Sequence, residues 1–154
     1  MIVLTPRQQL DVFLDRYTDA IASDMRRALR YLRRRVPGAT ELVYDNYNAL
    51  AVGFGPGERA SEAVLSLVAY PRWVSLFFLQ GAGLPDPAKL LKGSGTRVRH
   101  IVLTTPDVLV ATDVDALIAA ALRSARVTID PAGKRTMIIK SVAARQRPRR
   151  PAAR

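Results

Sequence analysis

The chain has 154 residues, the length of a single domain. It contains no cysteine, which excludes disulfide scaffolds, thiolate metal sites and cysteine nucleophiles. With 49% hydrophobic and 24% charged residues the composition is that of a folded globular chain, and the formal net charge is +11.

Two helices are predicted at the N-terminus. Thr5 followed by Pro6 is a typical helix start, because the hydroxyl caps free N–H groups and proline suits the first turn. Thr18 is expected to cap a second helix that runs to about Val36, where a Pro-Gly pair ends it. Each helix carries an apolar stripe at helical spacing. The stripes are Leu10, Phe13, Leu14 and Tyr17 in the first helix, and Met25, Leu29, Leu32 and Val36 in the second.

The centre of the chain has the alternation typical of strands, and a last helix follows it. We therefore expect an α+β fold, in which the N-terminal helix pair and the C-terminal helix pack on one face of an antiparallel sheet. The expected strands are residues 49–54, 63–69, 73–79, 98–103 and 136–140; residues 41–48 are a transition, 81–96 are mostly loop, and Asp113 caps a helix over 114–126.

The expected sheet is apolar on both faces. Trp73 and Phe77 alternate with Val74, Leu76 and Phe78, so each face of that strand carries large apolar side chains. One face is covered by the helices, and the other must meet a loop, a ligand or a partner. A second copy of the chain is one such partner, and a homodimer or protein-interaction module is one of the functions that we consider.

The positive charge is concentrated in the second helix and in the C-terminal residues. We expect one domain over residues 1–142, with the helix arginines facing water, and a disordered basic tail over residues 143–154. A solvated helix and a solubilising tail are one interpretation, and a nucleic-acid-binding module is another. The candidate nucleic-acid contacts are Arg26, Arg30, Arg33, Arg145, Arg147, Arg149 and Arg150.

A polar and aromatic cluster lies where the helices give way to the sheet. Asn and Asp favour turns in such places. The functional alternative is a pocket for a small ligand, with aromatic rings stacking on the ligand and polar groups orienting it. Trp73 is a stacking candidate or a core residue, and the only histidine, His100, is a pocket candidate or a structural residue. The candidate ligand-binding residues are Tyr44, Asp45, Asn46, Tyr47, Trp73 and His100.

No catalytic motif is present in the sequence, and we expect a protein that is not an enzyme. The segment from Lys92 to Thr96 has glycines next to a lysine, but the order of a phosphate-binding loop is reversed. No apolar run reaches the length of a membrane span, and the first residues do not form a secretion signal. A cytoplasmic location without membrane contact is therefore expected.

Several motifs along three-quarters of the chain resemble the YdhG-like family of small bacterial domains. They follow one another in the order that this family shows. The motifs are Arg35-Val36-Pro37-Gly38-Ala39, Glu41-Leu42-Val43-Tyr44, Tyr70-Pro71-Arg72-Trp73-Val74-Ser75-Leu76-Phe77-Phe78, Gly83-Leu84-Pro85-Asp86-Pro87, Leu90-Leu91-Lys92-Gly93-Ser94-Gly95 and Arg99-His100-Ile101.

The resemblance implies a fold similar to frataxin and, as in some members, an iron-chaperone function. Iron sites of that type use surface carboxylates on the first helix, which bind the metal weakly. The matching candidates here are Asp11, Asp15 and Asp19, which are also ordinary helix-surface acids. Iron or a small ligand is thus the expected cargo, and iron is the one cofactor that the resemblance suggests.

Overall fold

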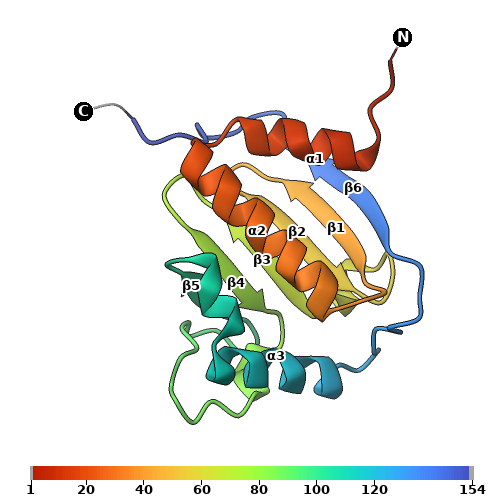
Figure 1. Ribbon diagram of the computed structural model, residues 1–154, viewed down its shortest axis with the longest axis vertical. Helices are drawn as coiled ribbons and strands as arrows, with labels where there is room; N and C mark the ends of the chain where they lie inside the picture. Colours follow the sequence, from red (N-terminus) through yellow and green to blue (C-terminus); the bar gives the residue numbers. More distant parts are fainter. Residues whose placement is uncertain (1, 153–154) are drawn as a thin grey trace.

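The computed structural model describes residues 2–152 and has three helices and a six-stranded sheet (Figure 1). The expected α+β class is confirmed. In chain order the elements are α1 (Pro6–Asp15), α2 (Asp19–Arg35), β1 (Thr40–Asp45), β2 (Leu50–Gly55), the 3₁₀ turn η1 (Ala60–Glu62), β3 (Leu65–Ala69), β4 (Val74–Phe78), η2 (Gly81–Gly83), β5 (Arg99–Leu103), η3 (Pro106–Val110), α3 (Thr112–Ser124) and β6 (Thr136–Val142).

The sheet is mixed, with the strand order β5-β4-β3-β2-β1-β6. Neighbours from β5 to β1 are antiparallel, and β6 lies parallel to β1. The prediction of a purely antiparallel sheet is therefore wrong at this edge. β6 follows β1 only after the rest of the sheet and α3, and such a long crossover permits a parallel return. β6 lies at the edge of the sheet.

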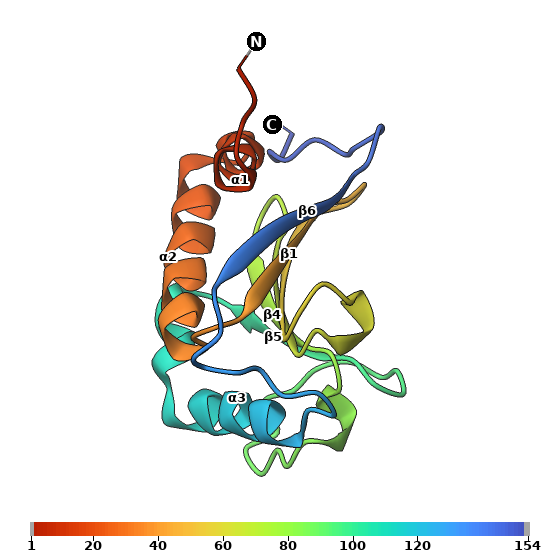
Figure 2. The same cartoon turned by 90° about the vertical axis from the view of Figure 1, so that its right-hand side faces the viewer.

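The helices form two groups around the sheet. α1 and α2 cover one face, whereas α3 crosses the end of the sheet at which β4 ends (Figures 1 and 2). The expectation that all three helices share one face is thus wrong for α3. Its apolar side still enters the common core, where Leu117 and Ile118 are buried. No helix within residues 2–152 combines the length and apolarity that crossing a membrane requires.

The predicted helix starts at the N-terminus are confirmed. The Gln8 N–H donates to the Thr5 hydroxyl (3.1 Å), and the Thr5 N–H donates to the Gln8 side chain (2.9 Å), which makes a complete capping box. The Thr18 hydroxyl accepts from the Ile21 N–H in the same way. α3 differs from its prediction, because Ala111 precedes its first turn and Asp113 lies within that turn.

β1 lies in residues for which the sequence predicted an irregular transition from the helices to the sheet, and not a strand. The strand lies between β2 and β6 and is buried on both faces except at Tyr44. Glu41 and Asp45 point to the same face as Val43, because they pair in register with core residues of β2. Two acids on the core side hid the alternation that normally reveals a strand.

The sheet face opposite α1 and α2 is partly covered by the segment that contains η1 (Figure 2). A side chain on Gly53 of this face would meet Leu42 and Ala63, and the Lys140 ammonium on β6 donates to the Glu58 carbonyl (3.0 Å). The rest of the face stays half-buried, and we call it the open face. Strand register places on it Tyr44, Ala51, Val68, Phe77, His100 and Val102.

The C-terminal residues differ from the expected disordered tail. The Ala143 N–H donates to the Asp45 carbonyl, and the Arg147 N–H donates to the Tyr47 carbonyl, each at 2.8 Å. The Arg149 side chain is buried against the turn between β1 and β2. The composition of the tail suggested disorder because it has no apolar stripe, but a buried carboxylate on β1 gives it an electrostatic partner.

Candidate functional site

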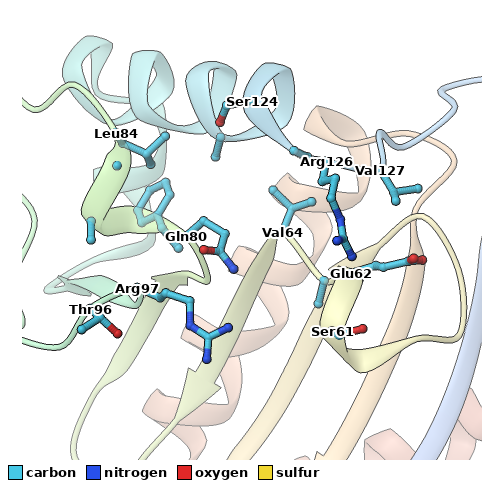
Figure 3. Close-up of a pocket in the computed structure, with 16 residues that line it drawn as sticks. Ser61, Glu62, Val64, Gln80, Leu84, Thr96, Arg97, Ser124, Arg126 and Val127 are labelled. Carbon is cyan, nitrogen blue, oxygen red and sulfur yellow. The ribbon is translucent and has the colours of Figure 1, made fainter.

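A cavity of about 710 Å³ lies at the end of the sheet that α3 crosses (Figure 3). Its size falls within the range of roughly 300–1,000 Å³ that small-molecule sites occupy. The wall is built by four segments that are distant in sequence: the end of η1 and the residues after it, the residues from the end of β4 through η2, the residues before β5, and the C-terminal turn of α3.

Backbone contacts hold these segments in place around the cavity. The Leu79 N–H donates to the Val64 carbonyl (3.1 Å), and the Ala82 N–H donates to the Arg97 carbonyl (2.9 Å). Gly81 allows the close approach of this turn, because a Cβ there would lie 2.6 Å from the Cβ of Arg99. The cavity is thus bounded by ordered backbone on these sides.

The deep part of the cavity is apolar. Val64, Phe78 and Ala121 line it and are buried residues of the hydrophobic core. Small side chains keep the space open, and a Cβ on Gly83 would meet no other atom within 4 Å. A ligand with an apolar body would therefore be desolvated against the core.

The outer part of the cavity is polar and carries a positive excess. Its charged lining residues are Glu62, Arg97 and Arg126, and Gln80 adds an amide. Figure 3 places Gln80 and Arg97 on one side of the opening and Arg126 on the other, beside Glu62. Among residues 2–152, neither arginine side chain forms an ion pair or a hydrogen bond. Both guanidinium groups are free to bind a ligand.

None of the candidate ligand-binding, metal or nucleic-acid residues predicted from the sequence lines this cavity. The sequence did mark the Gly- and Pro-rich segment over residues 81–96, which supplies one wall. The two arginines gave no signal, because Arg97 and Arg126 stand alone between elements and are brought together only by the fold. Spacing along the chain could not have revealed them.

The predicted ligand-binding residue Asp45 instead binds the chain's own tail. Its carboxylate, 1% exposed, pairs with Arg149 (2.9 Å) and with Arg16. The Gln146 amide donates to the same carboxylate at 3.0 Å. Arg149 also donates to the carbonyls of Asn46 and Tyr47. The tail thus occupies the position at Asp45 where the sequence predicted a ligand pocket, and a ligand-binding function of this cluster stays a prediction.

The aromatic members of that cluster do not face one cavity. Tyr47 is 48% exposed, and the Arg147 guanidinium lies 5.6 Å from its ring centre. Tyr44 lies on the open face, where burial raises the pKa of its phenol. The β1–β2 turn is closed by the Asn46 N–H, which donates to the Ala49 carbonyl (3.0 Å). These contacts are those of a structural turn.

Trp73 and His100 each stack on a neighbour. Trp73 packs against Tyr70 with ring centres 4.8 Å apart and stays 42% exposed, and burial raises the pKa of the Tyr70 phenol. His100 stacks on Phe77 at 5.1 Å on the open face. Four strand spacings, about 19 Å, separate the strands of His100 and Tyr44. The predicted ligand-binding residues therefore do not converge.

The carboxylates of the expected iron ridge lie next to a guanidinium group. Arg26 on α2 pairs with Asp15 (3.0 Å) and approaches Asp11 (3.9 Å). Asp15 and Asp19 line a small surface groove together with Arg26 and Arg30. Within residues 2–152, no three His, Asp or Glu side chains are placed to hold a metal ion together. The structure thus differs from the expected iron site, because the arginines neutralise the acids.

The arginines of α2 mostly connect elements of the fold. Four of the six in this helix form ion pairs: Arg26 with α1, Arg27 with Asp107, Arg33 with Glu41 and Arg35 with Asp115. The expectation that they face water is wrong for Arg33, whose side chain is 12% exposed. In the tail, the Arg150 guanidinium donates to the Arg16 carbonyl, and Arg145 is exposed. The candidate nucleic-acid contacts therefore do not form one free basic surface.

No protein-family model, curated protein or solved structure gives a significant match to this chain. The resemblance to the YdhG-like family and the frataxin-like fold that it implies therefore rest on the quoted motifs alone, and both stay predictions.

Proposed function

We propose that this chain is a binding domain for a small organic molecule, which occupies the cavity at the end of the sheet. The observation that carries the proposal is the combination of an apolar floor with a few polar groups at the opening, which is the usual composition of a ligand site. Phe78 and Val64 supply the floor, and Gln80, Arg97 and Arg126 supply the polar groups.

This proposal keeps the small-ligand function expected from the sequence and moves it to other residues. It agrees with the YdhG-like resemblance, which implies a non-enzymatic binding function. The iron version has less support because Arg26 pairs with the acids. A nucleic-acid function has less support because ion pairs hold most arginines of α2.

A titration with small neutral aromatic probes tests the proposal. Indole and phenol, added to millimolar concentration, should shift the backbone amide resonances of Val64, Gln80 and Leu84 in ¹H–¹⁵N spectra. Gly83→Phe should abolish these shifts by filling open space in the cavity. Shifts spread over the open face instead would contradict the proposal.

A second glycine provides the matched control. A Cβ on Gly57 also meets no atom within 4 Å, and Gly57 does not line the cavity. Gly57→Phe should therefore fold normally and keep the probe shifts of the wild-type protein. If both variants bind the probes as well as the wild-type protein, the cavity is not the binding site.

A further inference from the structure

We propose that the ligand of this cavity carries an anionic group, a carboxylate or a phosphate, whose principal contact is Arg97. This inference rests on the proposed function, since it names the chemical class of ligand for the same site. The anionic group would bind at the polar opening, and an apolar body would lie against Val64 and Phe78.

The charge at the opening favours an anion. Two arginines face one acid, Glu62, across the lining. Both guanidinium groups lack a carboxylate partner within the described chain, so binding an anion breaks no existing ion pair. A guanidinium group offers parallel N–H donors that match a carboxylate or phosphate.

The surroundings of the two arginines differ, and they single out Arg97. Arg126 lies two residues after Ser124, the last residue of α3, near the negative end of the helix dipole, and Figure 3 places it on the side of Glu62. Both features offset its charge. Arg97 precedes β5, and Figure 3 places it on the side of Gln80, whose amide is a neutral donor. An anion is therefore bound more strongly beside Arg97.

The polarity of the cavity further restricts the ligand. A purely ionic ligand would leave the apolar floor of Val64, Phe78 and Ala121 without a partner. A purely apolar ligand would offer no acceptor to the guanidinium groups of Arg97 and Arg126. An organic acid or phosphate ester with an aromatic or aliphatic body satisfies both parts.

A matched pair of probes tests the inference on the full chain. The probes 4-phenylbutyrate and 4-phenylbutyramide have nearly the same shape and differ in charge. We expect wild-type protein to bind the carboxylate at least about tenfold more tightly than the amide in ¹H–¹⁵N titrations. Octyl phosphate against octanol provides the same comparison for a phosphate.

Single substitutions test which residues cause the preference for the carboxylate over the amide. Arg97→Gln should remove most of the preference for the carboxylate, Arg126→Gln should reduce it less, and Glu62→Gln should raise affinity for the carboxylate. Each should change affinity for the amide less than affinity for the carboxylate, because a neutral amide forms weaker contacts with a guanidinium group than a carboxylate does. Arg72→Gln removes the same charge from an exposed site outside the cavity and should leave the preference unchanged.

The outcomes separate this inference from the proposed function. If carboxylate and amide bind equally well in the cavity, the cavity binds ligands but the anionic class is wrong. If Arg72→Gln lowers the preference as much as Arg97→Gln, general charge attraction replaces a specific contact, and the inference fails. If neither probe of either pair shifts the cavity resonances, the proposed function fails as well.

Discussion

The Tyr17 side chain, between α1 and α2, forms hydrogen bonds with two strands of the sheet. Its hydroxyl donates to the Ala69 carbonyl on β3 (2.6 Å) and accepts from the Leu50 N–H on β2 (3.1 Å). The residue is 1% exposed. Burial raises the pKa of this phenol above its ordinary value, and the nearby Arg149 guanidinium opposes that effect.

The raised pKa of Tyr17 predicts a loss of stability in alkali. The phenol is protonated in both states at neutral pH. As the pH rises through about 10, the unfolded chain loses this proton while the folded chain keeps it, so the free energy of unfolding falls. For a single group the slope reaches at most about 1.4 kcal/mol per pH unit.

Urea denaturation between about pH 8 and pH 11 measures this slope. Tyr17→Phe should cost about 1–3 kcal/mol at the lower pH, since both hydrogen bonds are lost, and should flatten the alkaline decline. Tyr47→Phe, at an exposed ring, should keep the wild-type slope. An unchanged slope in Tyr17→Phe would contradict the assignment.

α2 is the element that connects the other layers. Its apolar stripe is buried against β3 and β4, and its arginines reach α1, β1, η3 and α3. The pair between Arg33 and Glu41 is the most buried of these, with three N–H···O contacts of 2.9–3.2 Å. A buried ion pair is costly to break from one side, because the remaining charge has no partner.

Replacing Arg33 alone should therefore lower the free energy of unfolding more than replacing Arg33 and Glu41 together. Arg33→Met leaves the Glu41 carboxylate, 2% exposed, without its partner and should lower the free energy of unfolding by about 3–5 kcal/mol. The double variant Arg33→Met with Glu41→Met should recover most of that loss. Chemical denaturation of the single and double variants measures the difference.

An arginine on the same helix serves as the control for this comparison. Arg30 is exposed and forms no ion pair within residues 2–152, so Arg30→Met should change stability by at most about 0.5 kcal/mol. Equal losses in the single and double Arg33 variants would mean that packing, and not the unpaired charge, sets the cost.

At the scale of the whole molecule, the C-terminal residues pack against the first strand and the turn that follows it. The tail returns to β1 after β6 and places Arg149 against Asp45, 104 positions earlier in the sequence. Arg16, at the end of α1, binds the other oxygen of the same carboxylate. One buried acid thus joins the first helix, the first strand and the tail.

Hydrogen exchange tests whether the C-terminal residues pack against β1 in solution. The amides of Ala143 and Arg147 donate to backbone carbonyls of the β1–β2 region and should exchange about 10-fold to 100-fold more slowly than in an unstructured peptide. Asp45→Asn should remove most of this protection, whereas Glu58→Gln, at an exposed acid, should not. Exchange at unstructured rates in the wild-type protein would show that the tail is free.

Local patterns in the sequence predicted the parts of the fold that depend on neighbouring residues. Thr5 and Thr18 mark helix starts because capping involves residues three positions apart. The alternation in residues 63–69 and 73–79 predicted β3 and β4, because successive side chains of a strand point to opposite faces. β1 was missed because its two acids, Glu41 and Asp45, point to the core side, where arginines from other elements pair with them.

The sequence by itself determined the helix pair, most strands and the α+β class, since these follow from short-range periodicity and capping. Only the tertiary structure decided the parallel edge strand, the position of α3, the order of the tail and the cavity with Arg97 and Arg126. Each of these depends on contacts between residues far apart in the chain. Such contacts form only when the core brings the segments together, and no window of sequence contains both partners.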